Sequence, residues 1–315
     1  MLRNLTEYHW AERIDEALLL LARLDVRTVA LAGGTALLAS NNDDIEAVVD
    51  LRDLGLSTVT EDMRGVHIGA MTTLQQLMQH PLSSSIACGI LSQAAHCSAP
   101  SHAIRNSATI GGTLALGVAS HADILTVLAA LEAQAVVRSG SRTEVSLNGG
   151  MLERSGAGYS GIVYKGKQER RLDAASVSKE RLPNELIIDV VMPRFGQQVQ
   201  GAFARISNTP TGVALLNVAL VVTIEQDQLR RVRVVFGGGD MAPVRCVSVE
   251  QVLEGQALQT VRNMQSLDAL LQKGLMAFRP TTDRYASGGY RKASAVQLMR
   301  QVCEAVLTKH VSIAV

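Results

Sequence analysis

Residues 104–114 read IRNSATIGGTL, and this stretch decides the fold that we expect for the chain. It carries the pair Gly111-Gly112 between Thr109 and Thr113. Glycine has no Cβ, so its backbone N–H groups can approach a phosphate closely, and threonine hydroxyls add further donors. The spacing matches neither the dinucleotide fingerprint GxGxxG nor the P-loop GxxxxGK. Taken alone, the stretch indicates only a tight turn.

A similar turn lies near the N-terminus, where a β-prone apolar run over residues 28–32 ends in Gly33-Gly34-Thr35. Such a run predicts a buried strand that opens into a glycine turn. Thr35, like Thr113, can add a hydroxyl donor to a phosphate oxygen. Both turns suit the diphosphate of a dinucleotide cofactor, although either one in isolation indicates only a tight turn.

The sequence around these turns predicts short strands alternating with helices. Apolar runs indicate the strands, and apolar residues at helical spacing indicate the helices. A capping box at Thr72 and Gln75 is expected to open a helix that ends near Pro81. The expected strands are 28–32, 47–51, 66–70 and 135–138; the further expected helices are 84–96 and 122–131, with a loop over 98–109 and a glycine turn at 110–113.

The last third of the chain has a different pattern, which predicts an antiparallel hairpin followed by helices. We place the main boundary near residues 176–184, where charged and polar sequence precedes Pro183. The expected strands are 186–192, 213–224 and 229–236, with a polar turn at 225–228, and the expected helices are 262–277 and 294–307.

Composition excludes several classes of function. The 315 residues carry a formal net charge of +1 and only 3% aromatic residues, which argues against a nucleic-acid binder. No apolar run approaches the roughly 20 residues of a membrane span, and the polar start predicts a cytoplasmic protein. The four cysteines form no CxxC pair, so we expect no iron–sulfur or zinc site built by this chain alone.

Three motifs resemble one known family. Residues 32–38 (AGGTALL) match its first flavin loop, AGGT-x-LL, and residues 104–114 match its second loop, IRN-x-x-TIGG-N-L, with Thr113 in place of the usual Asn. Residues 68–72 (IGAMT) match its IGA-x-T strand end. The chain thus resembles the FAD-binding (medium) subunit of the molybdenum hydroxylases, of the carbon monoxide dehydrogenase and xanthine dehydrogenase type.

The resemblance extends over nearly the whole chain and implies an α+β fold. Gly237-Gly238 with residues 242–245, and later Tyr290-Arg291, match motifs of the family's last domain. The implied architecture is a two-part FAD-binding domain of the vanillyl-alcohol-oxidase-like type, followed by an α+β C-terminal domain with a small antiparallel sheet and helices. We expect these domains to span residues 1–178, with subdomains split near 55–65, and residues 179–315.

The function implied by the resemblance is an oxidoreductase subunit that carries FAD. A partner chain with a molybdenum cofactor would oxidise the substrate, and a [2Fe–2S] partner would deliver electrons to this chain, which would pass them to NAD or another external acceptor. Two alternatives stay open: a free-standing FAD oxidoreductase, and a structural subunit that has lost its flavin. Substrate and acceptor do not follow from the sequence.

The resemblance also implies cofactor-binding residues, and it implies no catalytic residue and no metal ligand in this chain. Asp123 matches the family's flavin-contacting carboxylate but would serve equally as a helix cap, and Arg105 could bind phosphate or brace its own loop. Residues 208–212 (NTPTG) replace the family's basic pair and Asp, which leaves flavin binding on that side open. The expected cofactor-binding residues are Ala32, Gly33, Gly34, Thr35, Ala36, Leu37, Thr109, Ile110, Gly111, Gly112, Thr113, Asp123, Met192 and Arg205.

Overall fold

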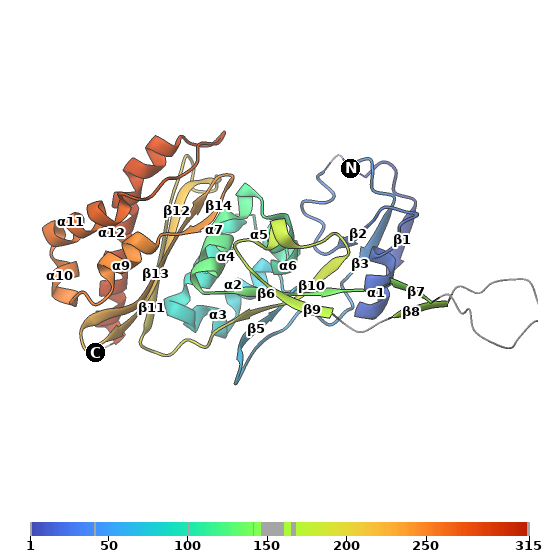
Figure 1. The fold of residues 1–315 in the computed structure, drawn as a ribbon, viewed down its shortest axis with the longest axis horizontal. Coiled ribbons are helices and arrows are strands. Elements are labelled where there is room, and N and C mark those ends of the chain that lie inside the picture. The colour runs from blue at the N-terminus through green and yellow to red at the C-terminus, as the bar shows by residue number, and fades with distance from the viewer. Residues whose placement is uncertain are drawn as a thin grey trace, which may run out of the picture.

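The computed structural model of the chain describes residues 2–40, 42–99, 101–140, 142–145, 161–164 and 168–313. Figure 1 shows the three larger sheets following one another along the long axis, with helices packed between and against them. Among the described residues, no helix is both long enough and apolar enough to cross a membrane.

The N-terminal sheet is small and parallel. Its strand order is β1-β3-β2, and β3 is buried along its whole length because it is the central strand. Helix α1 presents Ala17, Leu18 and Leu21 to a core that also contains Val49 and Leu51. The elements are β1 (Glu7–Trp10), α1 (Ile14–Leu21), β2 (Thr28–Leu31) and β3 (Ala47–Asp50).

The central sheet is antiparallel in the order β4-β5-β10-β6-β9, and the helices between β5 and β6 cover one of its faces. Its strands are β4 (Val59–Asp62), β5 (Gly65–Gly69), β6 (Gln134–Ser139), β9 (Gln168–Asp173) and β10 (Glu185–Met192); β7 (Arg142–Val145) and β8 (Gly161–Tyr164) form a separate pair. The helices are α2 (Leu74–Gln79), α3 (Pro81–Ser85), the 3-10 turn η1 (Ile86–Gly89), α4 (Ile90–Ser98), α5 (His102–Ser107), α6 (Ile110–Leu116), the 3-10 turn η2 (Ala119–His121), α7 (Ala122–Ala130) and α8 (Val177–Glu180).

The C-terminal sheet, in the order β11-β12-β13-β14, is buried on both faces. Along β12, Leu216, Val218 and Leu220 face the core that α9, α11 and α12 share, while Ala219 and Val221 face the central core. This explains why the strand is a continuous apolar run without alternation. The elements are β11 (Val199–Ser207), β12 (Ala214–Glu225), β13 (Gln228–Gly238), β14 (Met241–Arg245), α9 (Val247–Leu253), α10 (Leu258–Arg262), α11 (Met264–Leu275) and α12 (Gly288–Ile313).

Several local predictions from the sequence are wrong. The capping box is formed one residue later than expected, by Thr73 and Gln76. The single helix expected over 84–96 is interrupted at η1, where Ala87 and Cys88 have positive φ. The expected loop over 98–109 contains helix α5.

Two further differences concern the elements around the glycine motifs. The glycine turn expected at residues 110–113 is the first part of helix α6, which Thr109 caps by accepting a hydrogen bond from the Gly112 amide. Strand β10, which we expected to enter the last domain, lies at the centre of the second sheet between β5 and β6. That position brings residues 185–187 close to α6.

Candidate functional site

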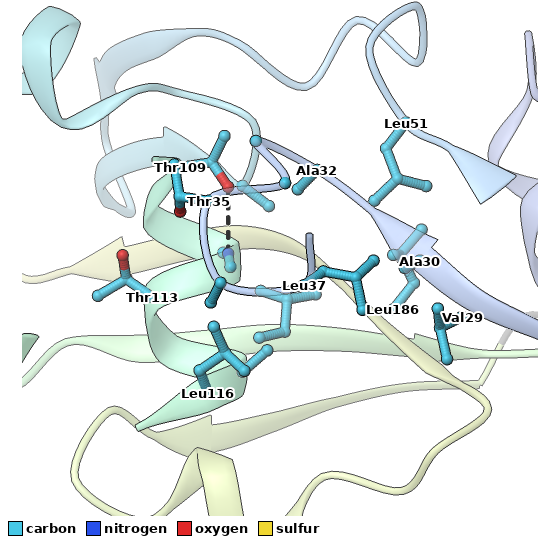
Figure 2. A pocket seen from close by; sticks show the side chains of 18 of the residues that line it. Val29, Ala30, Ala32, Thr35, Leu37, Leu51, Thr109, Thr113, Leu116 and Leu186 are labelled. Carbon is cyan, nitrogen blue, oxygen red and sulfur yellow. Dashed lines mark hydrogen bonds between the residues drawn. The ribbon is translucent and has the colours of Figure 1, made fainter. Parts of the chain in front are cut away.

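A pocket with a volume of about 520 Å³, within the usual range of ligand sites, lies between the two glycine loops. Its walls come from β2, the loop after it, the first turns of α6, and the start of β10. Figure 2 shows the threonines Thr35, Thr109 and Thr113 near the start of α6, and the aliphatic side chains of Val29 and Leu51 toward the N-terminal sheet. The pocket thus has a polar end and an apolar end.

The first loop, residues 32–37, lies against the backbone before α6. A Cβ on Gly33 would lie 1.6 Å from the carbonyl oxygen of Ser107, so only glycine allows this approach. Gly34 has a φ of +70°, which turns the chain back into the pocket wall. None of the backbone N–H groups of residues 33–37 donates a hydrogen bond to another described residue. The amide groups of this loop are therefore available to donate hydrogen bonds to an anion.

The second loop differs, because its amides are already bonded within the chain. The Gly111 amide donates to the carbonyl of Ala70 (2.9 Å), and the Thr113 amide donates to the carbonyl of Thr109 (2.9 Å). Ile110 is fully buried below the pocket and takes no part in lining it. What this loop offers is space beside Gly112 and the hydroxyl of Thr113.

Residues that the sequence reasoning missed also line the pocket. His121, Arg181 and Glu185 reach it from η2, from the end of α8 and from the first residue of β10. A resemblance could not point to them, since no motif contains them, and their approach to α6 depends on the position of β10 in the sheet.

Two family models match this chain. One, described as the FAD binding domain in molybdopterin dehydrogenase, matches residues 3–157, and the other, the CO dehydrogenase flavoprotein C-terminal domain, matches residues 202–306. The chain is a member of the FAD-binding medium subunits of the molybdenum hydroxylases.

Known relatives agree with this assignment. The medium subunit of nicotine 6-hydroxylase from Paenarthrobacter nicotinovorans is 28% identical over 276 residues, which cover 86% of this chain and 87% of the relative. The FAD subunit of nicotinate dehydrogenase from Eubacterium barkeri is 31% identical over 138 residues, which cover 42% of this chain and 46% of that relative. A structure of carbon monoxide dehydrogenase from Hydrogenophaga pseudoflava has the same fold, with a TM-score of 0.78, 22% identity, and coverage of 98% of this chain and 99% of that one.

The pocket of this FAD-subunit family member fits the cofactor. The free amides of residues 33–37 suit a diphosphate, and the apolar wall that includes Val29, Ala30 and Leu51 suits a flat aromatic base. Ten of the fourteen expected cofactor residues meet at this pocket: Ala32, Gly33, Gly34, Thr35, Ala36, Leu37, Thr109, Gly111, Gly112 and Thr113.

Asp123 and Arg205 meet each other, and the structure does not bring them to the pocket wall. Arg205 Nε lies 3.3 Å from Asp123 Oδ2, and Asn217 donates a hydrogen bond of 2.7 Å to Asp123 Oδ1. Burial raises the pKa of the Asp123 carboxyl, and Arg205 and Asn217 oppose that shift. Asp123 lies in the first turn of α7 and is not its N-cap. Met192, at the end of β10, is buried away from the pocket.

Arg205 also holds the segment that departs from the family pattern. Its guanidinium donates to the carbonyls of Pro210 (3.2 Å) and Gly212. The side chain of Arg205 is only 13% exposed. All of these contacts tie residues 208–212 to the start of α7 through one arginine.

Arg105 braces its own loop, which answers the question that the sequence left open. Its guanidinium donates to Gln75 Oε1 (2.9 Å) and to the carbonyl of Ala99 (2.8 Å), and its side chain is buried.

Among the described residues, no group of three or more His, Cys, Asp or Glu side chains is placed to hold a metal ion. Burial raises the pKa of the Cys97 thiol, which lies near Asp123 and Arg205.

Proposed function

We propose that this chain is the FAD-carrying electron-transfer subunit of a heteromeric molybdenum hydroxylase. In this proposal an iron–sulfur partner delivers electrons to it, a molybdenum-cofactor partner oxidises the substrate, and NAD or another external acceptor takes the electrons away. Its relatives, a nicotine 6-hydroxylase medium subunit and a nicotinate dehydrogenase FAD-subunit, support this role.

One observation carries the proposal: the two glycine loops touch at one pocket, and the first loop presents unbonded amides there. Bound FAD supplies the redox chemistry, and the chain fixes its position. Residues 33–37 hold the diphosphate through their N–H groups. The apolar wall between β2 and β3 excludes water from the base that stacks there.

The finer assignments belong to the same proposal. We assign the FAD-binding part to the two-part vanillyl-alcohol-oxidase-like type, with domains over residues 1–178 and 179–315, and we place the subunit in the cytoplasm. Asp123 is proposed to orient the cofactor, and Met192 and Arg205 to flank its ring. The ion pair between Asp123 and Arg205 supports the part of this assignment that places the two residues side by side.

A visible spectrum of the purified chain tests the proposal. We expect flavin bands near stoichiometric FAD content, either as purified or after addition of FAD. A colourless chain that gains no flavin bands with excess FAD would contradict it and would favour the flavin-less structural subunit. Purification of the intact complex, followed by molybdenum and iron analysis, separates the subunit from a free-standing FAD oxidoreductase, which would turn over a small substrate without partners.

A further inference from the structure

Three polar atoms in the walls of the pocket are buried and have no hydrogen-bond partner among the described residues. They are Thr113 Oγ1, His121 Nδ1 and Arg181 Nε. Thr113 is 2% exposed and His121 is 7% exposed, so water cannot replace the missing partners easily. A buried polar group without a partner destabilises a protein, and such groups are rare unless a ligand satisfies them.

The three residues that carry these atoms all line the pocket. Thr113 belongs to α6 and His121 to η2, and Arg181 follows α8, which packs against α6. They therefore add unpartnered side-chain groups to the cavity that the amides of residues 33–37 also line.

The chemistry of the three atoms is mixed. Arg181 Nε is a donor, and Thr113 Oγ1 can donate and accept. Burial lowers the pKa of His121, which favours the neutral ring, and in the tautomer protonated on Nε2 the unpartnered Nδ1 is an acceptor. A phosphate offers only acceptors at neutral pH and would leave His121 Nδ1 unpaired.

The ionised Glu185 carboxylate near Arg181 also disfavours a phosphate beside these three atoms. Arg181 Nη1 donates to the carbonyls of Leu182 (3.0 Å) and Glu185 (2.7 Å), and the Glu185 carboxylate opposes its positive charge. Arg170 and the Leu182 amide keep the pKa of Glu185 low, so that carboxylate is ionised. A neutral ligand group with both donors and acceptors suits this pairing of a guanidinium with a carboxylate.

We propose that Thr113, His121 and Arg181 form a subsite for the hydroxyl-bearing chain of the dinucleotide, either the ribose of its adenosine half or the ribityl chain of its flavin half. A hydroxyl donates to His121 Nδ1 while its neighbour accepts from Arg181 Nε, and Thr113 completes the contact. This inference rests on the proposed function, since the dinucleotide is FAD. It assigns His121 and Arg181 as specificity residues that no motif indicates.

The test measures the dissociation constants of FAD, FMN and ADP by calorimetry on the purified full chain and its variants. Thr113→Val and Arg181→Met each remove the unpaired polar atom and keep most of the side-chain volume. We expect FAD to bind roughly 3- to 10-fold more weakly to Thr113→Val and roughly 10- to 100-fold more weakly to Arg181→Met, the ranges usual for a neutral and a charged hydrogen bond.

Two matched variants serve as controls. Thr6 does not line the pocket, and its hydroxyl donates to the carbonyl of Glu46, so Thr6→Val should bind FAD like the unmodified chain. Arg284 also lies outside the pocket lining, and its exposed side chain is paired with Asp240, so Arg284→Met should have little effect. The ligand-free Thr113→Val chain should melt no lower than the unmodified chain, because the substitution removes an unsatisfied group.

The results distinguish a wrong subsite from a wrong proposed function. Weakened ADP binding with unchanged FMN binding assigns the subsite to the ribose, and the reverse assigns it to the ribityl chain. If the unmodified chain binds FAD and both subsite variants bind it equally well, or if the controls lose as much affinity, the subsite is refuted and the proposed function stands. An unmodified chain that binds no FAD refutes the proposed function, and the ligand assigned to this subsite with it.

Discussion

Substitution of Gly33 by alanine tests the contact between the two loops directly. The new Cβ would lie 1.6 Å from the Ser107 carbonyl oxygen and 2.5 Å from its carbon. Non-bonded heavy atoms prefer about 3.5–4.0 Å, so one loop must move by roughly 2 Å. Both contacting groups are backbone, so no change of side-chain rotamer relieves the clash.

The size of the effect follows from this displacement. Forcing extra volume into a packed site costs about 1–3 kcal/mol, and a backbone-to-backbone clash belongs at the upper end of that range. About 3 kcal/mol corresponds to a drop in melting temperature of roughly 6–12 °C for a domain of this size. The same energy, expressed in binding, corresponds to a loss of about 100-fold in FAD affinity.

Thermal unfolding followed by circular dichroism and FAD titration by calorimetry measure the two effects. Gly112→Ala is the control within the same pocket, because its Cβ meets only the Thr109 hydroxyl at 3.1 Å and Ala32 Cβ at 4.0 Å. We expect Gly112→Ala to melt close to the unmodified chain. Gly196→Ala, whose Cβ has open space, should change neither quantity. A Gly33→Ala chain that melts and binds FAD like the Gly196→Ala chain would refute the loop contact.

Three more predictions follow from buried ionisable groups. Asp123→Asn leaves the guanidinium of Arg205 without its carboxylate, and we expect a loss of about 3 kcal/mol in urea unfolding, whereas a change under about 0.5 kcal/mol would show that the pair does not stabilise the fold. Burial lowers the pKa of His121, so the unfolded chain binds more protons as pH falls below about 6.5. The contribution of the neutral His121 ring to folding stability is therefore complete above that pH and is lost below it. We expect His121→Leu to reduce the difference in melting temperature between pH 8 and pH 5.5, and an unchanged difference would contradict this. Burial raises the pKa of the Cys303 thiol to about 12, so mass spectrometry after iodoacetamide treatment at pH 8 should find Cys303 alkylated only in urea-unfolded chain, and labelling in the folded chain would contradict its burial.

The sequence was sufficient to predict the first glycine loop, because Gly34 needs a positive φ and this requirement is local. The strands of the hairpin β12–β13 were equally predictable, since a polar turn separates two long apolar runs. In both cases the residues that determine the structure are neighbours in sequence.

The remaining features depend on contacts that are distant in sequence. Residues 110–113 form a helix because Thr109 caps it, whereas the glycine pair by itself favours a turn. The break at η1 places Ala87 beside Gly201 of β11, and the helical periodicity on both sides of it conceals the break. Arg181 reaches the pocket only because β10 pairs between β5 and β6, and no pattern around residue 181 indicates that pairing.

The departure at residues 208–212 changes what Arg205 can do. The guanidinium of Arg205 already donates to the carbonyls of Pro210 and Gly212 and faces the Asp123 carboxylate. If Arg205 flanks a flavin ring, it does so while paired with Asp123, because leaving a buried carboxylate unpaired is costly. The loop without charged residues and the paired arginine therefore belong together, because Arg205 holds residues 208–212 through the carbonyls of Pro210 and Gly212 and pairs with Asp123 at the start of α7.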